Sequence, residues 1–456
     1  MRRKKLTEKY NYHSTRGKVP FIDFWSMIYL LIVCVFTLLF EQANIVVFGI
    51  YLICAIPFFN YPDKFVCICF LLSTMAYFFM GADEGIWSIY TILAVIMVFQ
   101  LIIKPNTTIR LQPVVLFLWM IFACVLSYNQ SRFDYKMGMF AMIYNVVIAL
   151  LLALTIKFDR DTLISFLPKM ATFQLIMYIM MLLINGHYDG YGFSISEKVN
   201  HNTFGSSVAI LSIIVWVKIV FYAGKSWKYK LFWGISLLLV FVSGSRNALL
   251  ATLLTSVLVY IISQKQQGKV IAGGMKFLFG SCIVLFLGGL LLPEIGIDLS
   301  RYDYIELIKG GGSNRAIIWE TLSPVIWEKH RWFGYGPGHF CSEQMITSLM
   351  NLKYSHTHNT IFEAWGELGL FGVICFLLIL FSVFKKSLFH AKNRTRYLMI
   401  GFLFVEFVLL GLGESFFANI DLWMIIGIIL GSSNNMDEAA SESCVYGRKE
   451  YGRVKE

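Results

Sequence analysis

Two arginines lie in predicted turns next to apolar blocks, where a positive charge is stabilised by an anionic partner. Arg246 lies in Val-Ser-Gly-Ser-Arg-Asn-Ala, residues 242–248, a short turn between two apolar blocks. Arg315 follows Gly-Gly-Gly-Ser-Asn, residues 310–314, at the start of a segment with helical apolar spacing. Guanidinium groups bind phosphate oxygens in bidentate fashion, and the first turn of a helix offers free N–H groups to the same anion. We therefore interpret both arginines as phosphate ligands; the alternatives are a headgroup or helix-end contact for Arg246 and a solvated loop for Arg315.

Three histidines lie at the heads of apolar blocks. His356 and His358, in Tyr-Ser-His-Thr-His-Asn-Thr, directly precede the block at 361–384. A histidine takes up a proton near neutral pH and can act as a general base. His201 heads another block, as a second outer histidine or as the neighbour of a helix cap. The residue pattern does not decide which of His356 and His358 would act.

Residues near these positions could support the site. Gly336 and Gly338, in Trp-Phe-Gly-Tyr-Gly-Pro-Gly-His-Phe from residue 332, permit tight turns and close approach to a ligand, although a plain surface turn is the simpler interpretation. They do not follow a strand of a nucleotide-binding unit, so a dinucleotide site is not expected. Asn359 stands beside His358. No His, Cys or carboxylate set with metal spacing accompanies the histidines, so we expect neither a metal nor another cofactor.

Five acidic residues lie within or near the last apolar blocks, and intramembrane acids usually face a polar cavity or pair with a cation. They are Glu363, Glu367, Glu406, Glu414 and Asp421. Glu367 is kept as a supporting site residue, and the group as a whole keeps proton-coupled transport open as a competing function.

The elements that must position these residues are membrane helices. The 456 residues are 57% hydrophobic and only 15% charged, and the apolar ones fall in blocks close to the thickness of a bilayer. We predict an all-α, polytopic bundle of about 12 to 14 transmembrane helices. The net charge of +11 lies in short clusters between the blocks, which indicates topology and not nucleic-acid binding. The candidate spans lie near 24–40, 44–59, 65–80, 86–103, 113–127, 138–156, 168–184, 203–222, 231–243, 248–263, 276–292, 359–384, 397–412 and 416–431.

Short basic loops are retained on the cytoplasmic side, and one register of the spans satisfies this rule. It predicts a cytoplasmic segment at 1–23, a transmembrane domain at 24–431 and a cytoplasmic tail at 432–456. The longest loop, 293–358, is then extracytoplasmic and contains short amphipathic helices.

One such helix is expected over 316–330, where Trp319, Leu322 and Ile326 recur at helical spacing and would lie on the membrane surface. Ser313 is its expected N-cap, which would place Arg315 in the first turn.

Four segments in this order resemble the O-antigen ligase and polymerase superfamily of bacterial membrane proteins. They are Gly244-Ser-Arg-Asn-Ala-Leu-Leu, Asn314-Arg-Ala-Ile-Ile-Trp, Trp332-Phe-Gly-Tyr-Gly-Pro-Gly-His-Phe and His358-Asn-Thr-Ile-Phe-Glu-Ala-Trp-Gly-Glu-Leu-Gly-Leu-Phe-Gly. The resemblance implies a metal-free enzyme of the bacterial inner membrane that transfers or polymerises glycans carried on undecaprenyl pyrophosphate. Arg246, Arg315 and His358 match the family's arginines and its His-Asn pair.

The leading interpretation is a Wzy-type polysaccharide polymerase that joins lipid-linked repeat units into capsule, exopolysaccharide or O-antigen. It would invert the anomeric configuration, and its partners would be the lipid-linked donor, a glycan acceptor, membrane lipid, and chain-length regulator and flippase proteins. A ligase that attaches finished glycan to a lipid or protein acceptor is the alternative within the enzyme class. A lipid-linked sugar flippase or proton-coupled transporter is the alternative outside it.

Overall fold

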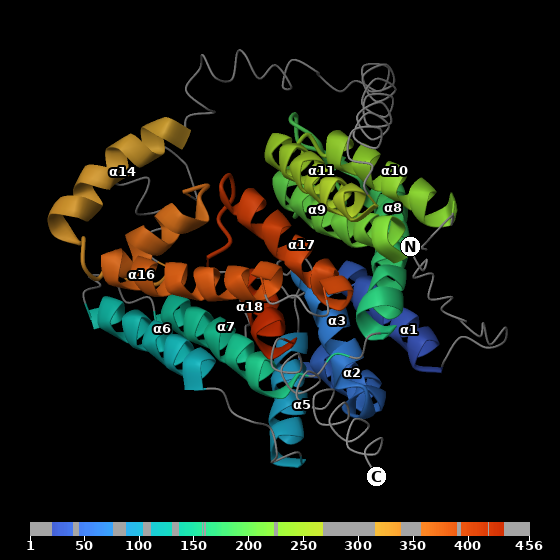
Figure 1. Cartoon of the computed structure of the whole chain (residues 1–456), viewed down its shortest axis with the longest axis horizontal. Helices are drawn as coiled ribbons and strands as arrows, with labels where there is room; N and C mark the ends of the chain where they lie inside the picture. Colours follow the sequence, from blue (N-terminus) through green and yellow to red (C-terminus); the bar gives the residue numbers. More distant parts are fainter. Residues whose placement is uncertain are drawn as a thin grey trace, which may run out of the picture.

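The protein is described by a computed structural model that covers residues 21–39, 45–75, 88–103, 111–129, 136–156, 158, 161–222, 227–267, 315–338, 357–389, 394–417 and 419–432. This part of the chain is helical apart from one hairpin of two short strands, so the predicted all-α class is confirmed. The helices are α1 (Phe21–Leu39), α2 (Ile45–Ala55), α3 (Pro62–Ser73), α5 (Ile89–Ile103), α6 (Leu111–Asn129), α7 (Lys136–Thr155), α8 (Leu167–Asn185), α9 (His201–Val217), α10 (Trp227–Val242), α11 (Arg246–Gln267), α14 (Arg315–Lys329), α16 (Thr360–Phe389), α17 (Arg394–Gly411) and α18 (Ile420–Ser432) (Figure 1). The short helical segments are η1 (Ile56–Asn60), η2 (Thr162–Phe166) and η3 (Lys218–Tyr222), and the strands are β1 (His187–Tyr188) and β2 (Phe193–Ser194).

Several helices are suited to a bilayer by length and composition. Among the described residues, five helices are long and apolar enough to cross a membrane. They are Phe21–Leu39, Thr162–Asn185, His201–Tyr222, Arg246–Ser263 and Thr360–Lys385. Shorter apolar helices accompany them, while the block predicted at 276–292 lies outside the described residues. The chain is thus an integral membrane protein, and the predicted number of 12 to 14 crossings stays a prediction.

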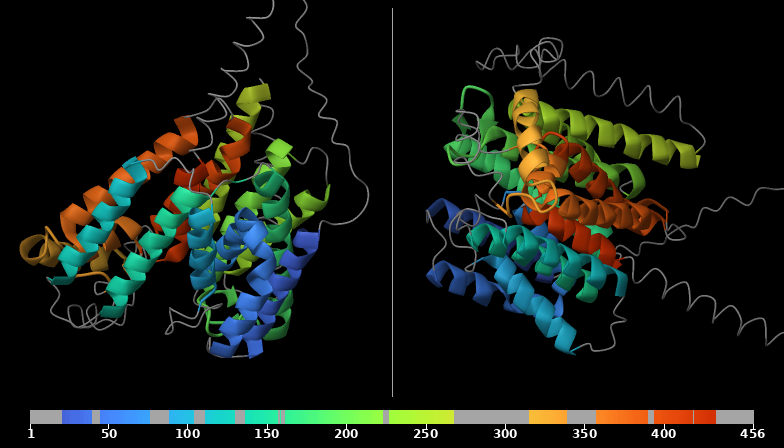
Figure 2. Two further views of the ribbon diagram at one scale, coloured as in Figure 1. Left: turned by 90° about the horizontal axis from the view of Figure 1, so that it is seen from below. Right: turned by 90° about the vertical axis from the view of Figure 1, so that its left-hand side faces the viewer.

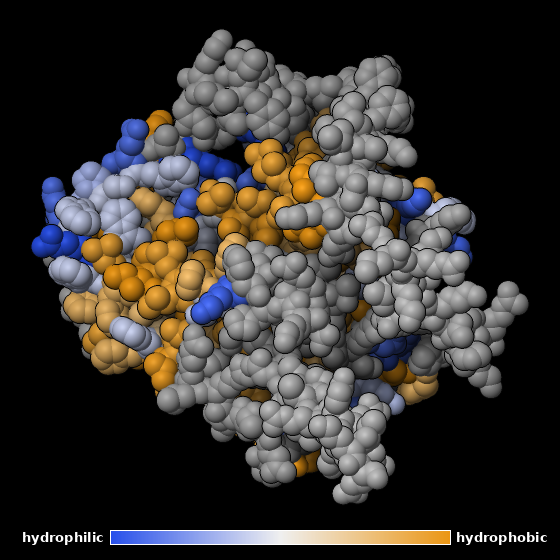
Figure 3. Space-filling view, in the orientation of Figure 1, coloured by the Kyte–Doolittle hydropathy of each residue, from blue (hydrophilic) through white to orange (hydrophobic). Residues whose placement is uncertain are grey.

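The outward faces of these helices are apolar, as lipid requires. Leu183 at the end of α8 is 77% exposed, and Ile102 of α5 is 70% exposed. In a water-soluble protein such side chains are usually buried, whereas contact with lipid hydrocarbon carries no free-energy penalty for an apolar side chain. In Figure 3 apolar side chains cover much of the coloured surface, and hydrophilic ones gather toward the side where α14 lies.

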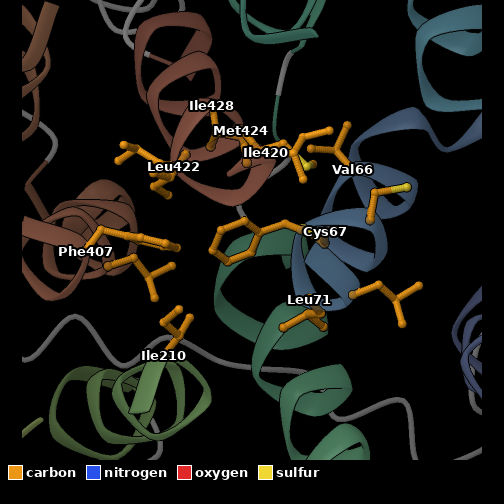
Figure 4. Close-up of a cluster of buried hydrophobic side chains, with 14 of the residues drawn as sticks. Val66, Cys67, Leu71, Ile210, Phe407, Ile420, Leu422, Met424 and Ile428 are labelled. Carbon is orange, nitrogen blue, oxygen red and sulfur yellow. The ribbon is translucent and has the colours of Figure 1, made fainter. Parts of the chain in front are cut away.

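The core is built by helices that approach closely through small residues. α18 packs along α7, and a Cβ atom at Gly427 or Gly431 would meet the backbone of Ala149 or Leu152. Membrane helices associate through such small residues because lipid supplies no hydrophobic drive between them. α3, α9 and α17 pack against α18 or against one another around it (Figure 4), with the side chains Val66, Cys67, Leu71, Ile210, Phe407, Ile420, Leu422, Met424 and Ile428.

One end of the bundle is marked by two lysines that share a carboxylate. Lys64 and Lys169 pair with Asp23 at 3.0 and 3.1 Å. α9 reaches the same end at Lys218, whose ammonium group donates to the backbone of η2. Its other end, at His201, lies where α11 begins. The side of the membrane that each end faces stays a prediction.

α16 is broken where a single straight span is predicted over 359–384. The backbone at Gly369 has φ 66° and ψ −168°, a conformation that is essentially restricted to glycine. Residues 360–368, the first arm, therefore meet residues 370–389, the second arm, at a sharp bend (Figure 1). The segment 331–336 enters this break: Tyr335 and Gly336 donate backbone N–H groups to the first arm, and the second arm donates back to Arg331 and Trp332.

The glycine-rich turn from residue 332 is thus part of the helix break. Gly334, Gly336 and Gly338 all have positive φ, and a Cβ atom on Gly334 would overlap the backbone at Glu367. The close approach at Gly334 is to protein backbone, and Gly336 donates its N–H to the Glu367 carbonyl at 2.9 Å. A supporting role of Gly336 and Gly338 toward a ligand stays a prediction.

Substituting Gly369→Ala is expected to lower the free energy of unfolding by about 2 to 4 kcal/mol, because alanine is strained at this φ and its Cβ would overlap the backbone of Trp332 and Phe333. Thermal unfolding of the detergent-solubilised protein would show this as a lower Tm. Gly234→Ala is the matched control, since its Cβ on α10 meets nothing within 4 Å and alanine favours a helix. Equal Tm values for the two variants would contradict the prediction.

Candidate functional site

One carboxylate connects two of the predicted site residues. Glu414 follows α17, and its Oε1 lies 3.7 Å from Nη2 of Arg315. Its other oxygen, Oε2, lies 3.7 Å from Nδ1 of His358. The side chains of all three are partly exposed, between 15% and 25%. An arginine and a histidine that are far apart in sequence therefore meet at one end of the bundle.

Arg315 is held by the helix that it starts. α14 begins at Arg315, so the predicted place in the first turn is confirmed, while Ser313 lies outside the described residues. The buried stripe of this helix packs against Tyr335, Phe362 and Trp365; its residues are Ile318, Leu322 and Ile326, with Trp319 partly buried beside them. The helix predicted on the membrane surface thus packs its apolar stripe against the first arm of α16. The ribbons of Figure 2 show α14 beside α16.

His358 is held in a turn between α14 and α16. Its backbone has φ 53°, and its neighbour Asn359 caps α16 by accepting hydrogen bonds from Ile361 N at 3.0 Å and Phe362 N at 2.9 Å. On the other side of His358, the carbonyl of Thr357 accepts a hydrogen bond from the indole N–H of Trp319 in α14, at 2.8 Å. Asn359 therefore acts as a helix cap that fixes where His358 stands. His356 lies outside the described residues.

The loop that carries Glu414 is held just as closely. Thr360 Oγ1 donates to the Glu414 carbonyl at 2.9 Å and accepts from Phe416 N at 3.0 Å. A Cβ atom at Gly413 would lie 2.9 Å from Nη1 of Arg315 and 2.6 Å from Cγ of Asn247, so the glycine lets both side chains approach this loop closely. Thr360 of α16 thus fixes the backbone of the loop that carries Glu414, and this loop lies beside Arg315 of α14.

Arg246 completes the group, which we call the Glu414 cluster: Arg246, Arg315, His358 and Glu414. Arg246 begins α11, and the adjacent Asn247 donates to the Leu410 carbonyl at 2.8 Å, which ties this turn to the end of α17. Burial lowers the pKa of Arg315, the Glu414 carboxylate raises it, and the charge of Arg246 lowers it again. Arginine side chains carry a positive charge in proteins, so Arg315 keeps its charge despite the lowered pKa.

The charges of the Glu414 cluster favour an anionic ligand. The Glu414 cluster contains two guanidinium groups, which repel each other, and one carboxylate, which lies 3.7 Å from Arg315. The starts of α11 and α14 add the positive ends of two helix dipoles. A phosphate or pyrophosphate group would relieve the repulsion between the arginines and accept hydrogen bonds from both.

Two supporting residues lie elsewhere. Glu367 is fully buried at the end of the first arm of α16, next to the break, and lies close enough to Cys124 of α6 for an electrostatic interaction. His201 is the first residue of α9, and its Nδ1 pairs with Asp189 of the hairpin. Neither residue is among those that surround Glu414. Among the described residues, no group of three His, Cys, Asp or Glu is arranged to hold a metal ion.

In the sequence, Glu414 is one of several acids near the last apolar blocks. Its place at the centre of the cluster follows from the fold of the loop at 411–417, and the signal in the sequence is slight. Gly-Leu-Gly-Glu, residues 411–414, puts an acid in a glycine turn at the predicted outer end of a span. Asn247 has no predicted role of its own, although its side chain joins the turn of Arg246 to α17.

Comparisons with known proteins agree with this geometry. The family described as O-Antigen ligase matches residues 231–377, a segment that contains Arg246, Arg315 and His358. A candidate polysaccharide ligase from Rickettsia typhi is 25% identical over 256 residues, which make up 49% of this chain and 59% of that relative. The predicted resemblance to the O-antigen ligase superfamily is thereby confirmed.

Proposed function

We propose that this member of the O-antigen ligase superfamily is a polysaccharide polymerase that joins undecaprenyl-pyrophosphate-linked repeat units. The observation that carries the proposal is the Glu414 cluster, where two guanidinium groups and an imidazole share one partly exposed end of a membrane bundle. The product would be a capsule, exopolysaccharide or O-antigen chain, made at the outer face of the bacterial inner membrane with both termini in the cytoplasm. Chain-length regulator and flippase proteins are its proposed partners.

The chemistry requires charge neutralisation and one proton transfer. The acceptor oxygen forms a bond to the anomeric carbon of the donor sugar, and the bond from that carbon to the pyrophosphate oxygen breaks. The leaving pyrophosphate carries the electron pair, and Arg246 and Arg315 stabilise its developing charge. We expect no metal to be needed for this step.

His358 is the proposed general base for the acceptor hydroxyl. Glu414 lies beside Nδ1, and we assign the proton transfer from the acceptor hydroxyl to the other ring nitrogen, Nε2. The carboxylate then stabilises the imidazolium that forms. Direct displacement inverts the anomeric configuration, so retention in the product, as determined by NMR of the new linkage, would contradict this mechanism.

Ligation is the second candidate, because the matching family and the Rickettsia typhi relative both carry the name of a ligase. The same cluster would serve that reaction with a lipid or protein acceptor in place of a second repeat unit. Specificity for the acceptor then separates the two functions.

A transporter would place its working ionisable residues at mid-bilayer depth. The late acids instead bond within the protein: Glu406 accepts a hydrogen bond from Thr252 of α11 at 3.3 Å, and Glu363 accepts one from Phe417 N at 3.3 Å. The ionisable groups of the Glu414 cluster gather at one end of the bundle, and this arrangement favours an enzyme over a transporter.

The test uses the purified chain in nanodiscs with a lipid pyrophosphate-linked repeat unit, in EDTA, and a gel that resolves product length. A ladder from donor alone supports the polymerase. A single product that forms only when a separate lipid or protein acceptor is added would overturn polymerisation in favour of ligation. The transporter would be favoured by absence of transfer in both conditions together with movement of the lipid-linked sugar across the membrane of vesicles that contain the chain.

A further inference from the structure

A small hairpin stands against the turn that presents Arg246. β1 and β2 pair antiparallel, His187 with Ser194 and Tyr188 with Phe193, and the turn between them is closed by a hydrogen bond from Asp189 N to Gly192 O at 3.3 Å. The hairpin connects α8 to α9 at the end of the bundle where α11 begins. No step of the proposed reaction uses it.

The hairpin and the turn interlock through glycines. A Cβ atom at Gly192 would overlap the carbonyl of Ser243, and one at Gly244 would overlap the carbonyl of Tyr191. Gly244 has φ 70°, which a larger residue adopts only with strain. Ser245 follows, with Arg246 as the next residue, so the position of the hairpin sets where α11 can start.

Hydrogen bonds of the Asp189 carboxylate hold the hairpin in this place. Oδ1 of Asp189 accepts hydrogen bonds from Tyr191 N at 2.9 Å and Gly192 N at 3.1 Å, while Oδ2 pairs with Nδ1 of His201. His201 is 5% exposed and is the first residue of α9, which Asn200 caps. Asp189 thus bonds both to the backbone that touches Gly244 and to a buried residue of a rigid span.

The charge of Asp189 persists at neutral pH. Its partial burial raises the pKa, but the hydrogen bonds from His201 and from the N–H groups of Tyr191 and Gly192 lower it further than burial raises it, so the net pKa is below the ordinary value. A carboxylate that stays ionised keeps all three of its acceptor contacts.

We propose that Asp189 and His201 are positioning residues that hold the turn 243–245 and thereby aim the Arg246 guanidinium at the pyrophosphate of the donor. This inference rests on the proposed function, because it assigns the pair to the same anion site. The two residues act through Arg246 and do not touch the substrate. A displacement of about 1 Å at a charge-stabilising group can cost roughly 100-fold in rate, which is the scale on which such a support matters.

The first arm of the test needs no activity. Hydrogen exchange of the amides at 243–249 is expected to become faster in Asp189→Ala and in His201→Ala, because the turn loses its support. Asp189→Asn keeps the acceptor oxygen for the turn and is expected to fall between wild type and Asp189→Ala. His187→Ala is the matched control: it removes an exposed histidine from the same hairpin and is expected to leave the exchange unchanged.

The second arm measures transfer. Asp189→Ala and His201→Ala are expected to lower kcat/KM for the lipid-linked donor about 10- to 100-fold, with His187→Ala close to wild type. Combining Asp189→Ala with Arg246→Ala is expected to add little to the loss caused by Arg246→Ala alone, since residues that act in one chain of contacts are not additive.

Two results would overturn the inference: unchanged exchange at 243–249 in both alanine variants, or a double variant whose loss is the full product of the single losses. Both outcomes differ from a failure of the proposed function. If wild type transfers no glycan, the function falls, and the exchange experiment still decides whether the pair holds the turn.

Discussion

Replacing Arg246 or Arg315 with alanine is expected to slow glycan transfer roughly 100- to 1,000-fold, the scale at which one charge-stabilising group contributes to a transition state. Burial and repulsion by Arg246 already lower the pKa of Arg315, so the pair is arranged at some electrostatic cost that an anionic ligand would offset. The charge on the leaving pyrophosphate grows as the sugar bond breaks. Initial rates at saturating donor should therefore fall more steeply than donor binding weakens.

Arg331→Ala provides the control for a simple loss of positive charge. Arg331 is an exposed arginine of the same loop region, and its guanidinium lies over the rings of Trp327 and Trp332, at 5.8 Å from each centroid. Its substitution should change the rate less than about twofold. If Arg331→Ala slows transfer as much as Arg315→Ala does, the Glu414 cluster has no special role.

Lysine variants separate the two contributions of the guanidinium. Lysine keeps the charge but loses the planar fork that binds two phosphate oxygens at once. Arg315→Lys also loses the fixed geometry toward Glu414, whose Oε1 is 3.7 Å from Nη2. We expect a rate between those of wild type and Arg315→Ala; a rate equal to wild type would show that charge alone is sufficient.

Local patterns in the sequence predict many of the helices. The apolar blocks predicted the helices because hydrophobic length is a property of each segment alone. The apolar spacing predicts the helix at 316–330, and Ser313 as its expected N-cap predicts that Arg315 lies in the first turn. The gathering of Arg246, Arg315 and His358 at one end of the bundle was expected from the sides assigned to their turns.

Long-range packing decided what the sequence interpretation could not reach. The block 359–384 is apolar enough on both sides of Gly369 to predict one span, although Glu363 and Glu367 lie within it. The break depends on the segment 331–336, far earlier in the chain, which hydrogen-bonds to both arms. Glu414 lies 3.7 Å from both Arg315 and His358 only because its loop is held by Thr360. His201 could be noticed as a histidine at a helix head, but its partner Asp189 is brought to it by a hairpin of two-residue strands, too short for a strand pattern.

His358→Asn is expected to slow transfer about 100- to 10,000-fold while leaving the fold intact, which makes it the sharpest test of the general base. His358 has φ 53°, and asparagine is one of the few residues that adopt this conformation readily. The asparagine amide has no basic nitrogen, so the variant removes the proton acceptor and keeps the backbone. Tm should stay near that of wild type, whereas His358→Ala should lose a similar rate and about 1 kcal/mol of stability as well.

Added imidazole distinguishes a missing base from a disturbed site. The ring of His358 is partly exposed, at 25% of its side chain, so its removal leaves space that reaches solvent. Imidazole in the buffer should restore part of the transfer by His358→Asn and none by Arg315→Ala, because only the first variant lacks a proton acceptor. A His358→Asn protein that keeps its rate within about twofold would show that His358 is not the base. The same assay on His356→Ala would then test the other histidine of the motif, which the sequence alone could not separate from it.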